Sequence, residues 1–239
     1  MFPGRSVSMK LRAPLAAAVV CSGLLAGPAS AAYISASDIV SGSSGGLTFS
    51  SSGGSLGLKT VAGVEGAGVT SGAGGNEIDI GQSITADSSS GFVLSGTTLA
   101  FLYDGPEFGD YQEVATITAN FFGSSDTSTA VLTNTYTSAN DTILSLLIDG
   151  VDMTSLILGA SEATSATAGT VDLGALFGNT LLSSLTYTAT AGTCGTGSCN
   201  NQSDYGIASI STASVPEPAT VALLGLGLAG IGMSRRRKA

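Results

Sequence analysis

Most of the chain between its two ends alternates apolar with polar residues, and this period of two limits the fold more than any other feature. The alternation is strict in Glu77 to Ile80, and it recurs in Val114 to Phe121 and in Leu181 to Ala189, where Leu185, Tyr187 and Ala189 share one face with Leu181. Phe92 to Tyr103 is a longer run with Leu99, Phe101 and Tyr103 on one face, and Ile143 to Ile148 is nearly all apolar. Because successive side chains of a strand point to opposite faces, such segments favour half-buried strands. The pattern predicts an all-β fold, a single jelly-roll-like β-sandwich.

Turn signals separate these segments. Residues 41–75 are rich in glycine and serine, which favours short strands with tight turns over disorder. Asp149-Gly150 is a turn dipeptide directly after Ile148. Helical periodicity is weak between the two ends, and Met153 to Leu158 is the best candidate for one or two helical turns.

The N-terminus predicts a secretory signal peptide over residues 1–31. Lys10 and Arg12 supply a positive region, Leu15 to Leu25 supplies a short apolar core, and Ala29-Ser30-Ala31 is an A-x-A cleavage site. Both Met1 and Met9 are candidate starts. The residue before Cys21 is Val20, where a lipoprotein signal needs a small residue, so lipidation is not favoured.

The C-terminal tail, residues 215–239, predicts a membrane helix with a processing site in front of it. The apolar segment Ala219–Met233 would span about 22 Å as a helix, which is short for a bilayer unless the basic residues that follow it extend its reach. By the positive-inside rule the basic end stays in the cytoplasm and the bulk of the chain lies outside. Pro216 and Pro218 keep the junction extended, so that a processing enzyme could grip it.

This arrangement resembles the PEP-CTERM sorting signal of Gram-negative bacteria. The matching residues are Val215, Pro216, Glu217 and Pro218, the Gly/Leu-rich segment, and Arg235, Arg236 and Arg237. The resemblance covers about a tenth of the chain. It implies recognition by an exosortase, a membrane cysteine protease, and cleavage near the motif. It also implies a bacterium that makes exopolysaccharide and biofilm. An ordinary C-terminal anchor with a chance Pro-Glu-Pro is the alternative.

Charge is divided unevenly along the chain. Seven of the eight basic residues lie in the two ends, so Lys59 is the only base between them. The same region holds sixteen acids, which gives it a net charge of −15, against −9 for the whole chain. A domain this acidic repels nucleic acid and anionic lipid. The sequence also contains no histidine, which excludes a Ser-His-Asp or Cys-His centre and favours a protein that is not an enzyme.

Two cysteines remain after removal of the signal peptide. Cys194 and Cys199 enclose a four-residue loop, and an even pair in an exported protein predicts a disulfide. A metal half-site or a redox pair is the alternative, although no histidine or third cysteine is present to complete a metal site.

One acidic run between two predicted strands is the candidate site for chemistry. Asp104, Glu107, Asp110 and Glu113 lie at three-residue spacing, and the glycines and proline among them exclude a helix. We favour a solvated turn, with a Ca²⁺ site as the second interpretation, because Ca²⁺ prefers carboxylate and carbonyl oxygens. Catalytic carboxylates of a glycan-cleaving enzyme are the third. No other cofactor is predicted.

Together these observations predict three parts: a signal peptide (1–31), a Gly/Ser/Thr-rich β-sandwich ectodomain (32–214) and the sorting signal (215–239). The expected function is a structural or adhesive role in an exported protein. A carbohydrate-binding module is the first alternative and a glycan-active enzyme the second. The expected partners are an exosortase, the membrane before cleavage, and exopolysaccharide. The expected location is an inner-membrane intermediate, then the cell surface or extracellular matrix.

Overall fold

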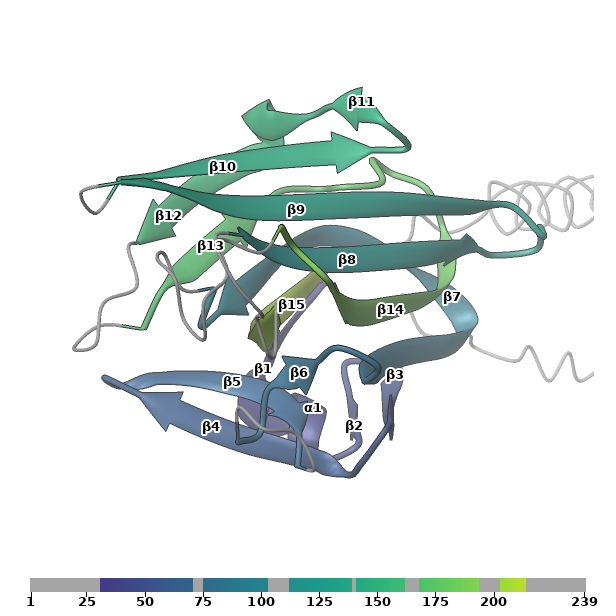
Figure 1. Cartoon of the computed structure of the whole chain (residues 1–239). Helices are drawn as coiled ribbons and strands as arrows, with labels where there is room; N and C mark the ends of the chain where they lie inside the picture. The colour runs from purple at the N-terminus through teal and green to yellow at the C-terminus, as the bar shows by residue number, and fades with distance from the viewer. Residues whose placement is uncertain are drawn as a thin grey trace, which may run out of the picture.

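The computed structural model describes residues 31–70, 75–102, 112–138, 141–161, 168–193 and 203–213. These residues form fifteen strands, one short α-helix and one 3₁₀ turn. Figure 1 shows how the strands and the helix are arranged. The strands are β1 (Ala32–Ser35), β2 (Ser43–Ser44), β3 (Leu47–Ser52), β4 (Leu56–Val61), β5 (Val64–Val69), β6 (Ile78–Asp79), β7 (Ser83–Ala100), β8 (Gln112–Phe121), β9 (Thr127–Ser138), β10 (Asp141–Ile148), β11 (Val151–Asp152), β12 (Ile157–Ser161), β13 (Thr170–Leu173), β14 (Leu182–Thr190) and β15 (Asp204–Ala213). The helices are α1 (Ala36–Val40) and η1 (Thr154–Leu156).

All fifteen strands belong to one connected antiparallel sheet, which confirms the predicted all-β fold. The main path of pairing runs β11-β10-β9-β8-β14-β7-β15-β5-β4, and the other strands pair at its sides. The finer prediction was a jelly-roll-like β-sandwich. It stays a prediction, because the hydrogen bonds join all the strands into one sheet and do not divide them into two.

Strand β7 connects the two parts of this sheet. Its first half pairs with β3 and β14 through Ser83 to Phe92, and its second half pairs with β13 and β15 through Val93 to Ala100. Gly91 lies beside the point of exchange with a φ of +78°, and a Cβ there would lie 2.7 Å from Cγ of Leu181. Glycine therefore allows the strand to leave one set of neighbours and join the other.

The hydrophobic core takes side chains from both halves of β7. Ile84 and Ala86 come from the first half and Leu94 and Leu99 from the second, and all four belong to one buried cluster. The inward positions of β8 and β14 fill the same cluster. The two parts of the sheet thus bury their apolar faces in common.

Two tyrosines bring hydroxyl groups into this core. Tyr187 Oη donates to Oγ1 of Thr97 over 3.2 Å, and Tyr205 Oη donates to the carbonyl oxygen of Thr188 over 3.1 Å. Both rings are fully buried, and this burial raises the pKa of each phenol. Both tyrosines therefore stay protonated near neutral pH and act as fixed donors inside the sheet.

The structure also tests the smaller predictions. Asp149 and Gly150 both have positive φ and join β10 to β11, which confirms the turn. The helical signal at Met153 to Leu158 corresponds to the single turn η1. Helix α1 was not predicted; it begins at Ser35, whose hydroxyl accepts from the Asp38 amide while the Asp38 carboxylate accepts from the Ser35 amide.

Several predictions lie outside the described residues. They concern the signal peptide up to residue 30, Cys194 and Cys199, Asp104, Glu107 and Asp110, and the tail from residue 214 onward. Among the residues that are described, none of the helices has the length and apolar character needed to cross a bilayer. The apolar segment 219–233 stays a predicted membrane helix.

Candidate functional site

The outward side of the sheet from β3 to β9 is lined with hydroxyl groups. We call this surface the hydroxyl face and define it by the serine and threonine residues at the outward positions of β3, β7, β14, β8 and β9. They are Thr48, Ser50, Ser52, Ser83, Thr85, Thr186, Thr188, Thr190, Thr116, Thr118, Thr127, Thr129, Thr133, Thr135 and Thr137. The residues that alternate with them, such as Leu185 of β14, Ile117 of β8 and Leu132 of β9, face the core, and Val114 and Val131 occupy outward positions among the hydroxyls.

The register of the strands aligns these hydroxyls in rows. One row runs across five neighbouring strands through Ser50, Thr85, Thr186, Thr118 and Thr129, each directly opposite the next. Neighbouring strands are about 4.8 Å apart, and outward residues repeat about every 6.8 Å along a strand. The result is a regular grid of donors and acceptors.

Hydrogen bonds between side chains hold parts of the grid in place. Thr85 and Thr186 lie 3.2 Å apart between their hydroxyl oxygens, and Thr116 and Thr190 lie 2.7 Å apart. Threonine suits such positions because its branched side chain favours strands and has few rotamers. These four hydroxyls are therefore held in place by their neighbours.

The hydroxyl face carries almost no charge. Asp87 is the one charged residue at the outward positions of these five strands within the described part of the chain, although the region between the two ends has a net charge of −15. Designed soluble surfaces aim for ~25–35% charged residues. The lack of charge suits contact with an uncharged partner.

An open groove of about 430 Å³ adjoins this face. It lies between the turn from β6 to β7 and the end of β14, where Ile80 and Ala189 form a parallel bridge. Ser83, Thr188 and Thr190 of the hydroxyl face line it, and the Ile80 side chain beside them is 44% exposed. The groove therefore combines aliphatic and hydroxyl groups.

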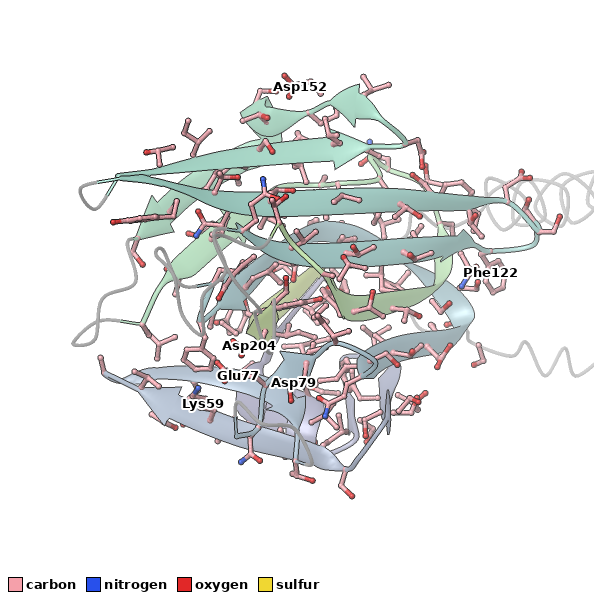
Figure 2. The ribbon with its side chains drawn as sticks, viewed as in Figure 1. Lys59, Glu77, Asp79, Phe122, Asp152 and Asp204 are labelled. Atoms are coloured by element: carbon pink, nitrogen blue, oxygen red, sulfur yellow. The ribbon has the colours of Figure 1, made fainter. Side chains whose placement is uncertain are left out.

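A second cluster contains buried acids and the only base between the chain ends. Glu77 is 1% exposed, Asp79 is 6% exposed, and Asp204 of β15, which pairs with Asp79, is 4% exposed. The ammonium of Lys59 on β4 lies 2.5 Å from Oε2 of Glu77 and 5.2 Å from the centre of the Phe101 ring. Figure 2 shows the three acids close together, with Lys59 approaching from β4.

Hydrogen bonds and strand pairing hold this cluster in the fold. The Gln82 side chain accepts from the Asp79 amide, and the Glu77 carbonyl accepts from the Val69 amide, so strand contacts tie the acids into the fold. Within the described ranges, no three acidic or cysteine side chains are arranged to hold a metal ion. Sequence reasoning missed the cluster because an alternating Glu-Ile-Asp-Ile segment normally places its acids toward solvent.

The predicted acidic site is only partly described. Glu113 belongs to β8 rather than to a loop, and it is 4% exposed at an inward position opposite Asn134. It therefore lies in a buried position, unlike a residue of a solvated turn. Asp104, Glu107 and Asp110 lie outside the described residues, so Ca²⁺ binding at this run stays a prediction.

Breaking the Lys59–Glu77 pair should destabilise the domain. Lys59→Met leaves the buried Glu77 carboxylate without its cation, and we expect the free energy of unfolding to fall by about 2–3 kcal/mol. This is somewhat below the ~3–5 kcal/mol of fully buried pairs, because the Lys59 side chain is 23% exposed. Urea unfolding measures the change. The double variant Lys59→Met/Glu77→Leu is the control and should regain most of the loss, whereas equal losses in both variants would contradict a dominant role for the ion pair.

Comparison with known proteins identifies the tail. Residues 214–238 match the family model of the PEP-CTERM protein-sorting motif. The comparisons with curated proteins and with solved structures give no match. The chain therefore carries a PEP-CTERM sorting motif at its C-terminus, which indicates an exported protein that an exosortase sorts to the cell surface through a membrane intermediate.

Proposed function

We propose that the exported domain has a structural or adhesive role at the cell surface or in the extracellular matrix, and that the hydroxyl face is its contact surface. The observation that carries this proposal is a five-strand surface with one charged residue, Asp87, in a domain of net charge −15. Charge elsewhere keeps the protein soluble during export. Because this face has almost no charge, contact with an uncharged surface or polymer does not remove charged groups from water without compensation.

Exopolysaccharide is the partner that suits this role. A polymer rich in hydroxyls offers many weak hydrogen bonds, each of about 1 kcal/mol, and a grid of hydroxyls engages several of them at once. Association would then rest on the number of contacts rather than on one strong site. The same property would suit a matrix or biofilm component.

A carbohydrate-binding module is the second candidate, and the groove beside β14 favours it. Such a module differs from a general adhesive surface by having a defined ligand groove. A glycan-active enzyme is the third candidate. Activity on a glycan that disappears when a single carboxylate is changed would be needed to support it.

We infer that the two parts of the sheet on either side of β7 pack as the two layers of a sandwich. The shared core of Ile84, Ala86, Leu94 and Leu99 supports this arrangement. We also propose that segment 219–233 forms the membrane helix of the sorting intermediate. Its apolar composition and the basic residues after it support that role.

The sorting motif leads to the first test. If Pro216-Glu217-Pro218 is the element that the exosortase recognises, Glu217→Ala should leave precursor in the membrane while export itself continues. Mass spectrometry of the released wild-type protein should find a C-terminus near the motif. A released wild-type protein that still contains residues 219–233 would argue against processing.

The adhesive role leads to the second test. Thr118→Glu and Thr186→Glu place charge in the middle of a hydroxyl row, and each should lower the fraction of exported protein retained on cells several-fold, because a charge must lose its hydration in the contact. Thr60→Glu on the edge strand β4 is the control, since it adds the same charge away from the face. Immunoblots of washed cells and of the medium measure the retained fraction. If Thr118→Glu and Thr186→Glu were retained as well as the control Thr60→Glu, the hydroxyl face would be ruled out as the contact surface.

A further inference from the structure

We infer that the groove between the β6–β7 turn and the end of β14 binds a sugar residue of a neutral polysaccharide. This inference rests on the proposed function and names the ligand class and its place on the surface. It uses the groove of about 430 Å³ that Ile80, Gln82, Ser83, Thr188 and Thr190 help to line.

The lining of the groove is chemically complementary to a sugar ring. A sugar ring has an apolar surface of C–H groups and a rim of hydroxyls. Ile80, at 44% exposure, offers an aliphatic surface to the ring, and Ser83 and Thr188 offer hydroxyls to its rim. Ligand sites of this kind combine apolar walls with a few placed polar groups.

The groove is held rigid from beneath. The fully buried Tyr205 donates to the carbonyl oxygen of Thr188, and Ser203 Oγ donates to the carbonyl oxygen of Thr190 over 2.6 Å. On the opposite wall, Gln82 and Asp79 exchange two hydrogen bonds, of 2.9 and 3.0 Å, and fix the turn that presents Ile80. A wall that is already ordered loses little conformational freedom on binding.

The negative charge of the domain favours a neutral polymer over an anionic one as the ligand of the groove. The residues that line the groove in the described part of the chain are uncharged, and the region between the chain ends has a net charge of −15. An anionic polymer would meet repulsion with no basic group to compensate it. Protein partners are less suited, because protein interfaces centre on tyrosine, tryptophan and arginine, and none of these lines the groove.

The hydroxyl face extends the site beyond one sugar residue. Ser83, Thr188 and Thr116 follow one another across β7, β14 and β8, so a chain seated in the groove would continue over this row. Individual contacts would be weak and their sum would set the affinity.

Affinity electrophoresis of the full exported protein tests the inference. The probes are dextran, hydroxyethyl cellulose and galactomannan as neutral polymers, and alginate as the anionic one. We expect retardation by at least one neutral polymer and none by alginate. Thr188→Val should weaken the apparent affinity about fivefold, because it removes one hydroxyl contact and keeps the shape of the side chain. Ile80→Ser should weaken it by at least as much.

Thr60→Val is the matched control, because it makes the same change on β4, away from the groove, and should leave retardation unchanged. Circular dichroism of each variant checks that it is folded. Retardation by alginate, lack of retardation by all three neutral polymers, or equal retardation of wild type and both groove variants would each overturn the inference. The protein could also be retained on cells and bind none of the neutral polymers. That result would overturn the sugar site but would leave the adhesive role in place.

Discussion

Strand β7 determines the positions of the other strands in the sheet. Every other strand pairs with it directly or through a short series of neighbours, and its two halves serve different parts of the sheet. At eighteen residues it is far longer than the usual strand of about five or six. Because both halves contribute to one core, either part of the sheet would expose its apolar face without the other.

The hydroxyl face follows from this arrangement. One half of β7 aligns β3 and β14, and β14 in turn aligns β8, so threonines far apart in the sequence become neighbours in rows. Burial of Tyr205 beneath Thr188 then fixes the end of β14 that forms one wall of the groove. Core packing and surface chemistry are thus linked through the same strand. The Lys59–Glu77 ion pair joins β4 to the residue directly before β6, the strand that leads into the β6–β7 turn.

The sequence predicted the fold class and the tail, and it predicted the surface chemistry poorly. Period-two alternation identified β8 and β14 because each has one face on the core. It could not show that Thr85, Thr118 and Thr186 share a row, since register depends on pairings between distant strands. Burial of Glu77 likewise depends on Lys59, eighteen residues earlier. Glu113 was assigned to a loop because the alternating pattern begins one residue later, at Val114, whereas its pairing with Asn134 of β9 places it inward.

Native-state hydrogen exchange along β7 tests most directly whether this strand joins the two parts into one cooperative unit. We expect the amides of Ser83 to Phe92 and of Val93 to Ala100 that bond to neighbouring strands to exchange only through global unfolding, with the same free energy and the same dependence on denaturant. If one half exchanged at a free energy several kcal/mol below the other, the two parts of the sheet would open independently. That result would contradict a shared core organised by β7.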